Sequence, residues 1–299
     1  MKKSMLIVPV LLAALTLAGG NVARADQKVD RRGDASAEGT VRIENLVGSI
    51  TVVGWDRKEV HVEGTLGDDV KELKFKTGKR KSVIEVEYPR HKNNLRDGAR
   101  LTIHVPEKSR VEVECVSAWI KASDLKGEVG LESVSGEVVF KGQCRELEIE
   151  SVSGSISVEG GAPQMELAGI SGRVRVEDCR ETELEVSTVS GPVSVQCKKM
   201  LGLSAESVSG EIEIIADDLG RGNFQCDAVS GSISFAVGGK VDADFEVSTF
   251  NGNIDNEFGQ KAHKTSKYTP GKELEFTNGR GEASVELNSF SGNVRIRKK

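Results

Sequence analysis

Apolar and polar positions alternate through most of the chain, and the alternating pattern recurs every 18 to 21 residues. Each copy contains a short motif, which reads Ser-Val-Ser-Gly at residues 133–136, 151–154 and 207–210. Residues two and four positions after the motif glycine are apolar, with Asn256 as the exception, and so are those two, five and seven positions before it. Alternation with a period of two is typical of strands with one buried face. Each copy therefore predicts two short strands.

The motif glycine marks the repeat register. The repeat glycines are Gly48, Gly136, Gly154, Gly172, Gly191, Gly210, Gly231, Gly252 and Gly292, and Ala118 replaces the glycine in one further copy. We expect the glycine and all five apolar columns, including the column two residues before it, to face the core. Either a crowded core or a backbone with positive φ would require glycine here, and the sequence leaves both explanations open.

A unit of two short strands cannot bury its apolar face alone, whereas stacked copies can. The pattern therefore predicts an all-β fold, a parallel β-solenoid (single-stranded β-helix) of about ten coils of 18–21 residues. At about 4.8 Å per coil the rod would be roughly 50 Å long. A β-sandwich is the alternative, but it needs antiparallel hairpins with tight turns, and Asn251-Gly252 is the one such pair in the repeat register.

The chain divides into segments at the two ends of the repeats. Lys2 and Lys3, an apolar run over 5–18 and the sequence Ala23-Arg24-Ala25 predict a signal peptide over residues 1–25. Residues 26–40 are expected to be an N-terminal linker and 41–299 the solenoid domain. Within that domain, 41–110 would form wider N-terminal coils or a cap, 111–254 the regular repeats, and 255–299 a loop and a terminal coil.

Charge narrows the range of partners. The net charge of -5 and the pI of 5.6 argue against nucleic acid. Residues 71–110 are basic, with 12 Lys or Arg against 5 Asp or Glu, and could meet anionic envelope polymers. Two acidic columns, six and four residues before the glycine, are expected to face solvent as a hydrated surface rather than as a cation site. They are Glu112, Glu148, Glu166, Glu185 and Glu246, and Glu114, Glu132, Glu150, Glu206 and Asp227.

No spacing in the chain predicts a catalytic residue, a cofactor site or a metal site. The five cysteines include no Cys-x-x-Cys pair. Cys179 and Cys197 share a corner on adjacent coils, where a disulfide would fit, although all five thiols could also be free. Cys226 falls on a core column. His61 and His104 lie at polar positions of strand-like runs and are expected to be exposed.

Several motifs resemble those of a known family. Residues 45–52 followed by Gly54-Trp55-Asp56, the strand 101–106, the serial Ser-Val-Ser-Gly motifs and Gly279-Arg280-Gly281 are similar to bacterial putative-adhesin proteins. These are exported β-strand-repeat proteins catalogued as a domain of unknown function. The resemblance implies a β-helix, and it supplies no catalytic residues because none is established for the family.

These observations favour a non-enzymatic, exported binding or structural module of the bacterial cell envelope, either periplasmic or at the cell surface. Its ligand is unknown, and an envelope glycan, a lipid or a protein would fit. After signal cleavage the chain is not expected to be integral to the membrane. An alternative is an envelope stress or signalling accessory that binds a membrane protein. A lesser alternative is a polysaccharide-active β-helix enzyme.

Overall fold

The computed structural model describes residues 27–90 and 94–299, and this part of the chain contains strands and no helix. The prediction of an all-β fold is confirmed, whereas the signal peptide predicted over 1–25 lies outside the described residues. The strands are β1 (Gln27–Asp34), β2 (Thr40–Trp55), β3 (Glu59–Leu66), β4 (Glu72–Lys76), β5 (Lys81–Glu87), β6 (Ala99–Pro106), β7 (Arg110–Ser123), β8 (Glu128–Ser133), β9 (Val138–Gln143), β10 (Glu146–Ser151), β11 (Ile156–Gly161), β12 (Gln164–Gly169), β13 (Val174–Thr188), β14 (Val193–Ser207), β15 (Ile212–Leu219), β16 (Asn223–Ala228), β17 (Ile233–Val237), β18 (Ala243–Thr249), β19 (Ile254–Asn256), β20 (His263–Lys264), β21 (Lys272–Asn278), β22 (Ala283–Ser289) and β23 (Val294–Lys298).

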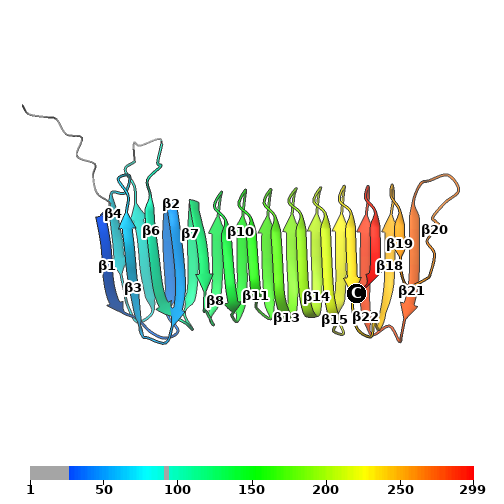
Figure 1. The fold of residues 1–299 in the computed structure, drawn as a ribbon, viewed down its shortest axis with the longest axis horizontal. Coiled ribbons are helices and arrows are strands. Elements are labelled where there is room, and N and C mark those ends of the chain that lie inside the picture. Colours follow the sequence, from blue (N-terminus) through cyan, green and yellow to red (C-terminus); the bar gives the residue numbers. More distant parts are fainter. Residues whose placement is uncertain (1–26, 91–93) are drawn as a thin grey trace, which may run out of the picture.

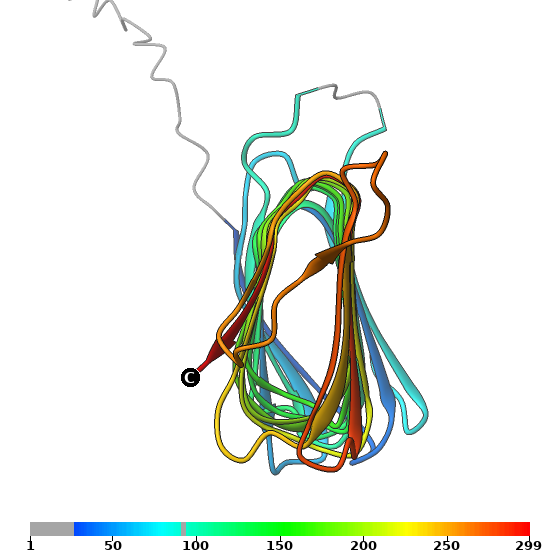
Figure 2. The same ribbon diagram turned by 90° about the vertical axis from the view of Figure 1, so that its right-hand side faces the viewer.

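Each repeat contributes one strand to each of two long faces, and neighbouring repeats pair in parallel (Figure 1). The leading face carries the strand before each motif, as in β8, β10 and β12, where Ile149 pairs with Leu131 and Leu167. The trailing face carries the strand after it, as in β9 and β11, where Val158 pairs with Phe140. Viewed along the stack, the repeats superpose into one flattened outline (Figure 2).

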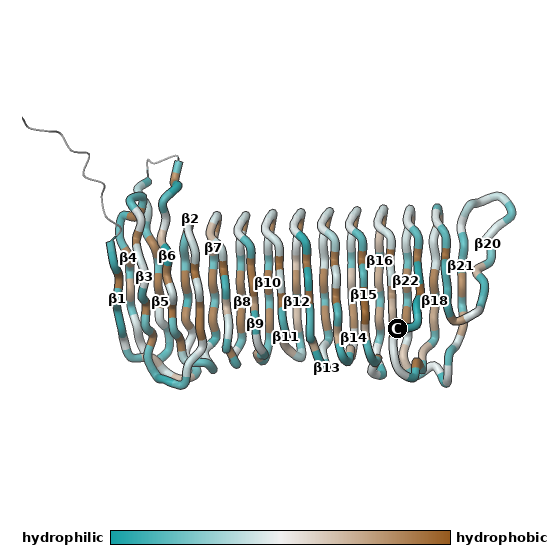
Figure 3. The backbone as a smooth tube through the Cα atoms, viewed as in Figure 1, coloured by the Kyte–Doolittle hydropathy of each residue, from teal (hydrophilic) through white to brown (hydrophobic). Residues whose placement is uncertain are grey.

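The core fills the space between the two faces. Leu147 and Ile149 point inward from the leading face, and Ile156 and Val158 from the trailing face, each at most 1% exposed. These are the columns seven and five residues before the glycine and two and four residues after it, so their predicted orientation is confirmed. The same alternation gives the repeating brown and teal bands of Figure 3. Stacking thus buries apolar faces that a single repeat would leave in water.

The apolar column two residues before the glycine is exposed, and our expectation that it faces the core was wrong. In the copy at 133–136, Ser133 and Gly136 are buried, whereas Val134 is 45% exposed. The chain turns at the two middle residues of the motif, so both side chains point outward.

The motif turn is held by its own hydroxyl and by the neighbouring repeat. The Ser151 hydroxyl accepts a hydrogen bond from the Gly154 N–H at 3.0 Å, and Thr188 or Ser207 does the same elsewhere. The Val152 and Ser153 N–H groups donate to carbonyls of the preceding turn at 3.1 Å and 2.8 Å. Backbone pairing therefore continues from repeat to repeat even where the chain reverses direction.

Close approach of backbones requires the repeat glycines. A Cβ atom at Gly154 would lie 1.9 Å from the carbonyl oxygen of Gly136, and at all nine repeat glycines the distance to a carbonyl oxygen is between 1.8 and 2.1 Å. Gly48 alone among the nine has a positive φ. Of the two explanations that the sequence left open, crowding therefore applies, and the crowding atom belongs to the backbone of a neighbouring repeat.

The order of repeats along the rod departs from their order in the chain at both ends (Figure 1). At the N-terminal end β2 lies between β6 and β7, with Ile50 paired to both Leu101 and Ile120. At the C-terminal end β22 lies between β16 and β18, with Leu287 paired to both Cys226 and Val247. The repeat predicted to be terminal is thus inserted inside the stack.

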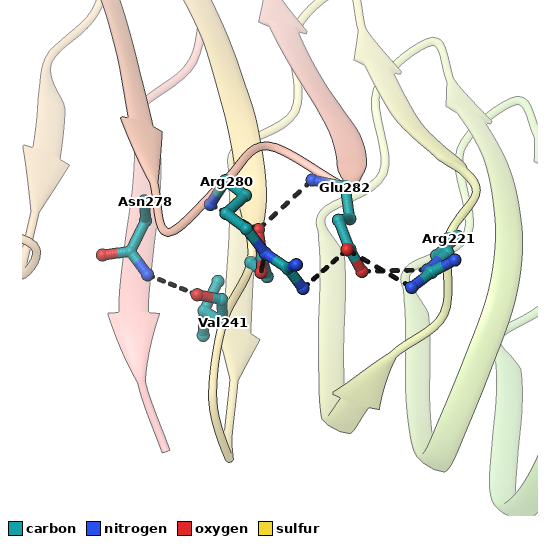
Figure 4. A network of polar contacts seen from close by, with 6 residues as sticks. Arg221, Val241, Asn278, Arg280 and Glu282 are labelled. Carbon is teal, nitrogen blue, oxygen red and sulfur yellow. Dashed lines mark hydrogen bonds and ion pairs between the residues drawn. The ribbon is translucent and has the colours of Figure 1, made fainter.

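A polar network fastens the inserted C-terminal repeat on both sides (Figure 4). Glu282, just before β22, contacts Arg221 of the preceding repeat at 2.9 Å and Arg280 at 2.7 Å. The Arg280 N–H donates to Asp242, just before β18, at 2.6 Å. Asn278 donates to the Val241 carbonyl at 2.5 Å. The network therefore spans the three repeats that this insertion joins.

Antiparallel strands cover both ends of the stack and correct two predicted segment boundaries. Residues 26–40 are not simply a linker, because β1 pairs with β3 along its whole length. The loop predicted at the start of 255–299 includes β20, and β21, which follows it, pairs with β18. Both segments are rich in charged residues, which concealed their strand character, since an edge strand buries few of its side chains.

Replacing Gly154 with alanine is expected to destabilise the protein by about 2 kcal/mol or more, because the added methyl must displace the neighbouring backbone. Gly130→Ala is the matched control: its Cβ would come no closer than 4.0 Å to Val111, so its stability should be equal or slightly higher. Urea unfolding followed by circular dichroism measures both. Equal stability of the two variants would contradict the crowding argument.

Candidate binding groove

The outward apolar column forms a ladder along the leading side of the motif turns. We call these ten side chains the apolar ladder. They are Leu46, Val116, Val134, Val152, Ile170, Val189, Val208, Val229, Phe290 and Phe250 in spatial order. Each is between 40% and 59% exposed. Phe290 and Phe250 stack with ring centroids 5.1 Å apart, which continues the ladder across the inserted repeat.

A parallel ladder of carboxylates runs beside the apolar ladder. Its members are acidic residues that face outward two positions before a residue of the apolar ladder, and we call them the acidic ladder. They are Glu44, Glu114, Glu132, Glu150, Glu206 and Asp227. The two ladders line a groove of about 910 Å³ that extends from Leu46 to Phe290, with the motif hydroxyls of Ser133, Ser151 and Ser207 between them. No Lys or Arg among the described residues lines this groove.

Stacking brings like charges together on the leading face. Partial burial, with Glu114 and Glu150 beside it, raises the pKa of Glu132 above its ordinary value. Partial burial and then Glu185 raise the pKa of Glu166, which lies in the second acidic column. The acidic columns face solvent as predicted, and like charge on neighbouring carboxylates adds to the burial that raises these two pKa values.

Arg42 offsets part of this charge at the N-terminal end of the acidic ladder. Its guanidinium lies 2.7 Å from both Glu44 and Glu114.

No set of three or more His, Cys, Asp or Glu side chains within residues 27–90 and 94–299 is placed to hold a metal ion. The groove is therefore an extended amphipathic surface, apolar along one wall and anionic along the other.

The sequence contained a signal that would have identified the apolar ladder. The apolar columns five and two residues before the glycine are three residues apart, and an odd spacing within one strand puts two side chains on opposite faces. The column five residues before the glycine is buried, so its partner is outward if the strand continues to the motif. That continuity became visible only in the structure.

The described part of the basic stretch over 71–110 includes β4 to β6, next to the N-terminal end of the stack. Lys71 lies 3.0 Å from Glu87, and Lys74 lies 3.2 Å from Glu85. Hydrogen bonds from Lys74 and then Lys71 lower the pKa of Glu87 to about 2. Part of the positive charge in this stretch is thus paired within the cap.

His61 is buried, and our expectation that it is exposed was wrong. Its ring stacks with His104, with centroids 5.7 Å apart, and Trp55 stacks on His104 at 5.0 Å. The Nε2 atom of His61 lies 3.0 Å from Asp30 of β1. The polar position faces outward as predicted, but the antiparallel strand β1 runs beside it.

The structure places Cys179 and Cys197 in register on adjacent repeats, with Cα atoms 4.7 Å apart and their sulfur atoms in contact. This separation is within the range that a disulfide spans. Cys115, Cys144 and Cys226 are buried and unpaired among the described residues. Burial raises the pKa of Cys115 and of Cys144 to about 12, and it raises that of Cys226 further.

The strands and the groove define an all-β repeat protein with one long amphipathic surface. The chain belongs to the Toastrack DUF4097 family, whose model matches residues 35–297. No curated protein matches the chain. Across residues 27–90 and 94–299, nothing helical has the length and apolar character to cross a membrane.

Three solved structures are similar to the chain at low sequence identity. A putative adhesin from Parabacteroides distasonis ATCC 8503 is 11% identical over 91% of this chain and 97% of its own, with a TM-score of 0.49. A putative adhesin from Bacteroides fragilis NCTC 9343 is 9% identical over 91% and 97%, with a TM-score of 0.36. A putative cell adhesion protein from Clostridium sporogenes ATCC 15579 is 12% identical over 91% and 100%, with a TM-score of 0.24.

Neutralising the crowded carboxylates is expected to stabilise the protein at neutral pH. A carboxyl whose pKa is raised by folding binds its proton more tightly in the native state, so native stability falls as pH rises through that pKa. Glu132→Gln combined with Glu166→Gln should therefore raise Tm by about 1 °C at pH 7. The gain should vanish at pH 3, where the carboxyls are protonated in both states.

Differential scanning calorimetry across pH 3–8 measures this effect. The control is Glu137→Gln combined with Glu211→Gln, which removes two exposed charges away from the acidic columns. A gain in Tm that is equal in both double variants, or that is unchanged at pH 3, would contradict the assignment of repulsion to the columns.

Thiol counting tests the cysteine pairing. Without reductant, the native protein is expected to react with no iodoacetamide, because its three free thiols are buried and their pKa values are raised. In denaturant the count should be three, and after reduction five. Mass spectrometry of the alkylated chain reads the count, and five thiols in unreduced denaturant would exclude the disulfide between Cys179 and Cys197.

Proposed function

We propose that this protein is a non-enzymatic binding or structural module of the bacterial cell envelope, exported and either periplasmic or at the cell surface. The observation that carries the proposal is the apolar ladder. All ten copies place a Val, Ile, Leu or Phe at an outward turn position, where it is 40% to 59% exposed. A contiguous exposed apolar patch is typical of an interaction site.

The proposal includes a parallel β-solenoid of about ten coils as the frame that presents the groove. The in-register parallel pairs of the leading and trailing faces support this description. Export rests on the predicted signal peptide over residues 1–25. The alternative, an envelope stress or signalling accessory that binds a membrane protein, would use the same groove.

The test compares three purified envelope fractions: glycan, phospholipid vesicles and detergent-solubilised membrane proteins. Binding of one fraction by the native protein, measured by biolayer interferometry, should be lost in Val152→Ser combined with Ile170→Ser. These side chains are 40% and 46% exposed, so the variant should fold normally. Glu137→Gln combined with Glu211→Gln should bind as the native protein does.

Each outcome separates the rival functions. Binding of the membrane-protein fraction alone favours the signalling accessory. Appearance of new reducing ends in the glycan fraction would favour the polysaccharide-active enzyme. Binding by none of the three fractions, or binding that the groove variant retains, would overturn the groove as the site of function.

A further inference from the structure

We propose that the groove binds a cationic amphipathic α-helix of a partner polypeptide, which lies along the rod. The inference rests on the proposed binding role and names its partner class. The helix would place its apolar stripe on the apolar ladder and its Lys and Arg side chains over the acidic ladder.

The spacing of the apolar ladder suits a helix. Neighbouring rungs of the ladder are separated by about 4.8 Å, the spacing of paired strands. An amphipathic helix presents one apolar side chain per turn, every 5.4 Å, so about seven turns of an aligned helix lie over the eight rung intervals of the groove. An extended strand along the same direction presents side chains on one face only every 6.6 Å or so, which does not match.

Backbone pairing also argues for a helix. The strands beneath the groove are hydrogen-bonded on both sides to the neighbouring repeats, and the motif turns are paired as well. No open strand edge in the described groove can take an added strand. A partner must therefore satisfy its own backbone, as a helix does.

Charge determines which helix fits. Six carboxylates line one wall of the groove, and the second acidic column, including Glu148 and Glu166, continues this charge across the leading face. Long Lys and Arg side chains that project beside an apolar stripe would reach both columns, and they would offset the like charge that, together with burial, raises the pKa values of Glu132 and Glu166.

The same charge disfavours two other occupants. A second copy of the chain docked through this groove would bring two acidic ladders together, and Arg42 offsets only part of that charge, at the N-terminal end. An anionic phospholipid surface would meet the carboxylates with like charge. The groove is long enough for the helix: nine repeats span roughly 38 Å, the length of about 25 helical residues.

The probe is a fluorescent 25-residue peptide of Leu and Lys, with Leu on one helical face and Lys on the other. Fluorescence anisotropy with the purified protein is expected to show saturable binding, and added salt should weaken it. Val152→Ser combined with Ile170→Ser, and Glu132→Gln combined with Glu150→Gln, should each weaken binding about tenfold or more.

Two matched variants control for nonspecific effects. Trp119→Ser removes a large side chain that is 67% exposed but lies outside the groove. Glu137→Gln combined with Glu211→Gln removes two charges outside it. Both should bind the peptide as the native protein does. Two control peptides, one with Glu in place of Lys and one with two central prolines that break the helix, should not bind.

Other results overturn the inference. Equal binding of the Lys and Glu peptides would contradict the role of charge. Peptide binding that the groove variants retain would contradict the groove as the binding site. If the protein binds phosphatidylglycerol vesicles and Val152→Ser combined with Ile170→Ser abolishes that binding, the groove binds lipid. If the protein forms a concentration-dependent dimer in sedimentation and the same variant abolishes the dimer, the groove binds a second copy of the chain. If the groove binds an envelope fraction but not the peptide, the proposed function stands and this inference fails.

Discussion

The close approach of each repeat glycine to a carbonyl oxygen of the neighbouring repeat sets the geometry of the rod. The absence of a side chain at Gly136, Gly154 and their equivalents lets the turns stack as closely as the strands do. At Gly136, Gly154, Gly191 and Gly210 the Ser or Thr hydroxyl three residues earlier accepts a hydrogen bond from the glycine N–H. Strand pairing and turn pairing therefore share one spacing, and no repeat can shift relative to its neighbours without losing both.

This shared spacing turns the sequence repeat into surface columns. A residue type that recurs at one repeat position becomes a line of identical side chains about 4.8 Å apart. The carboxylates of one column repel one another, and this repulsion adds to the burial that raises the pKa of Glu132. The apolar column at the motif turn becomes a ladder that water surrounds on its outer side. The groove is thus a consequence of the register of the repeats. It is already formed before a partner with a cationic and an apolar stripe binds.

The two ends of the stack are covered by strands that do not belong to the regular parallel pairing. An open end of a stack of strands exposes unpaired backbone groups, and these invite association with other chains. Here antiparallel strands β1, β3 and β21 cover the ends, and an out-of-order repeat is inserted near each one. At the C-terminal end the chain closes the stack with contacts among Arg221, Asp242 and Glu282, which come from three different repeats. Separate segments of sequence therefore hold each end together.

The sequence by itself determined the all-β class, the repeat register, the orientation of four of the five apolar columns and the exposure of the acidic columns. It could do so because periodicity is a local property that stacking preserves. The tertiary structure decided what depends on which repeats become neighbours: the place of the Gly292 repeat, the strand over 27–34, the burial of His61 and the reason for the glycines. It also decided the candidate site. Whether Val134 faces the core or water depends on where the chain turns, and a hydroxyl and a backbone contact from another repeat set that turn.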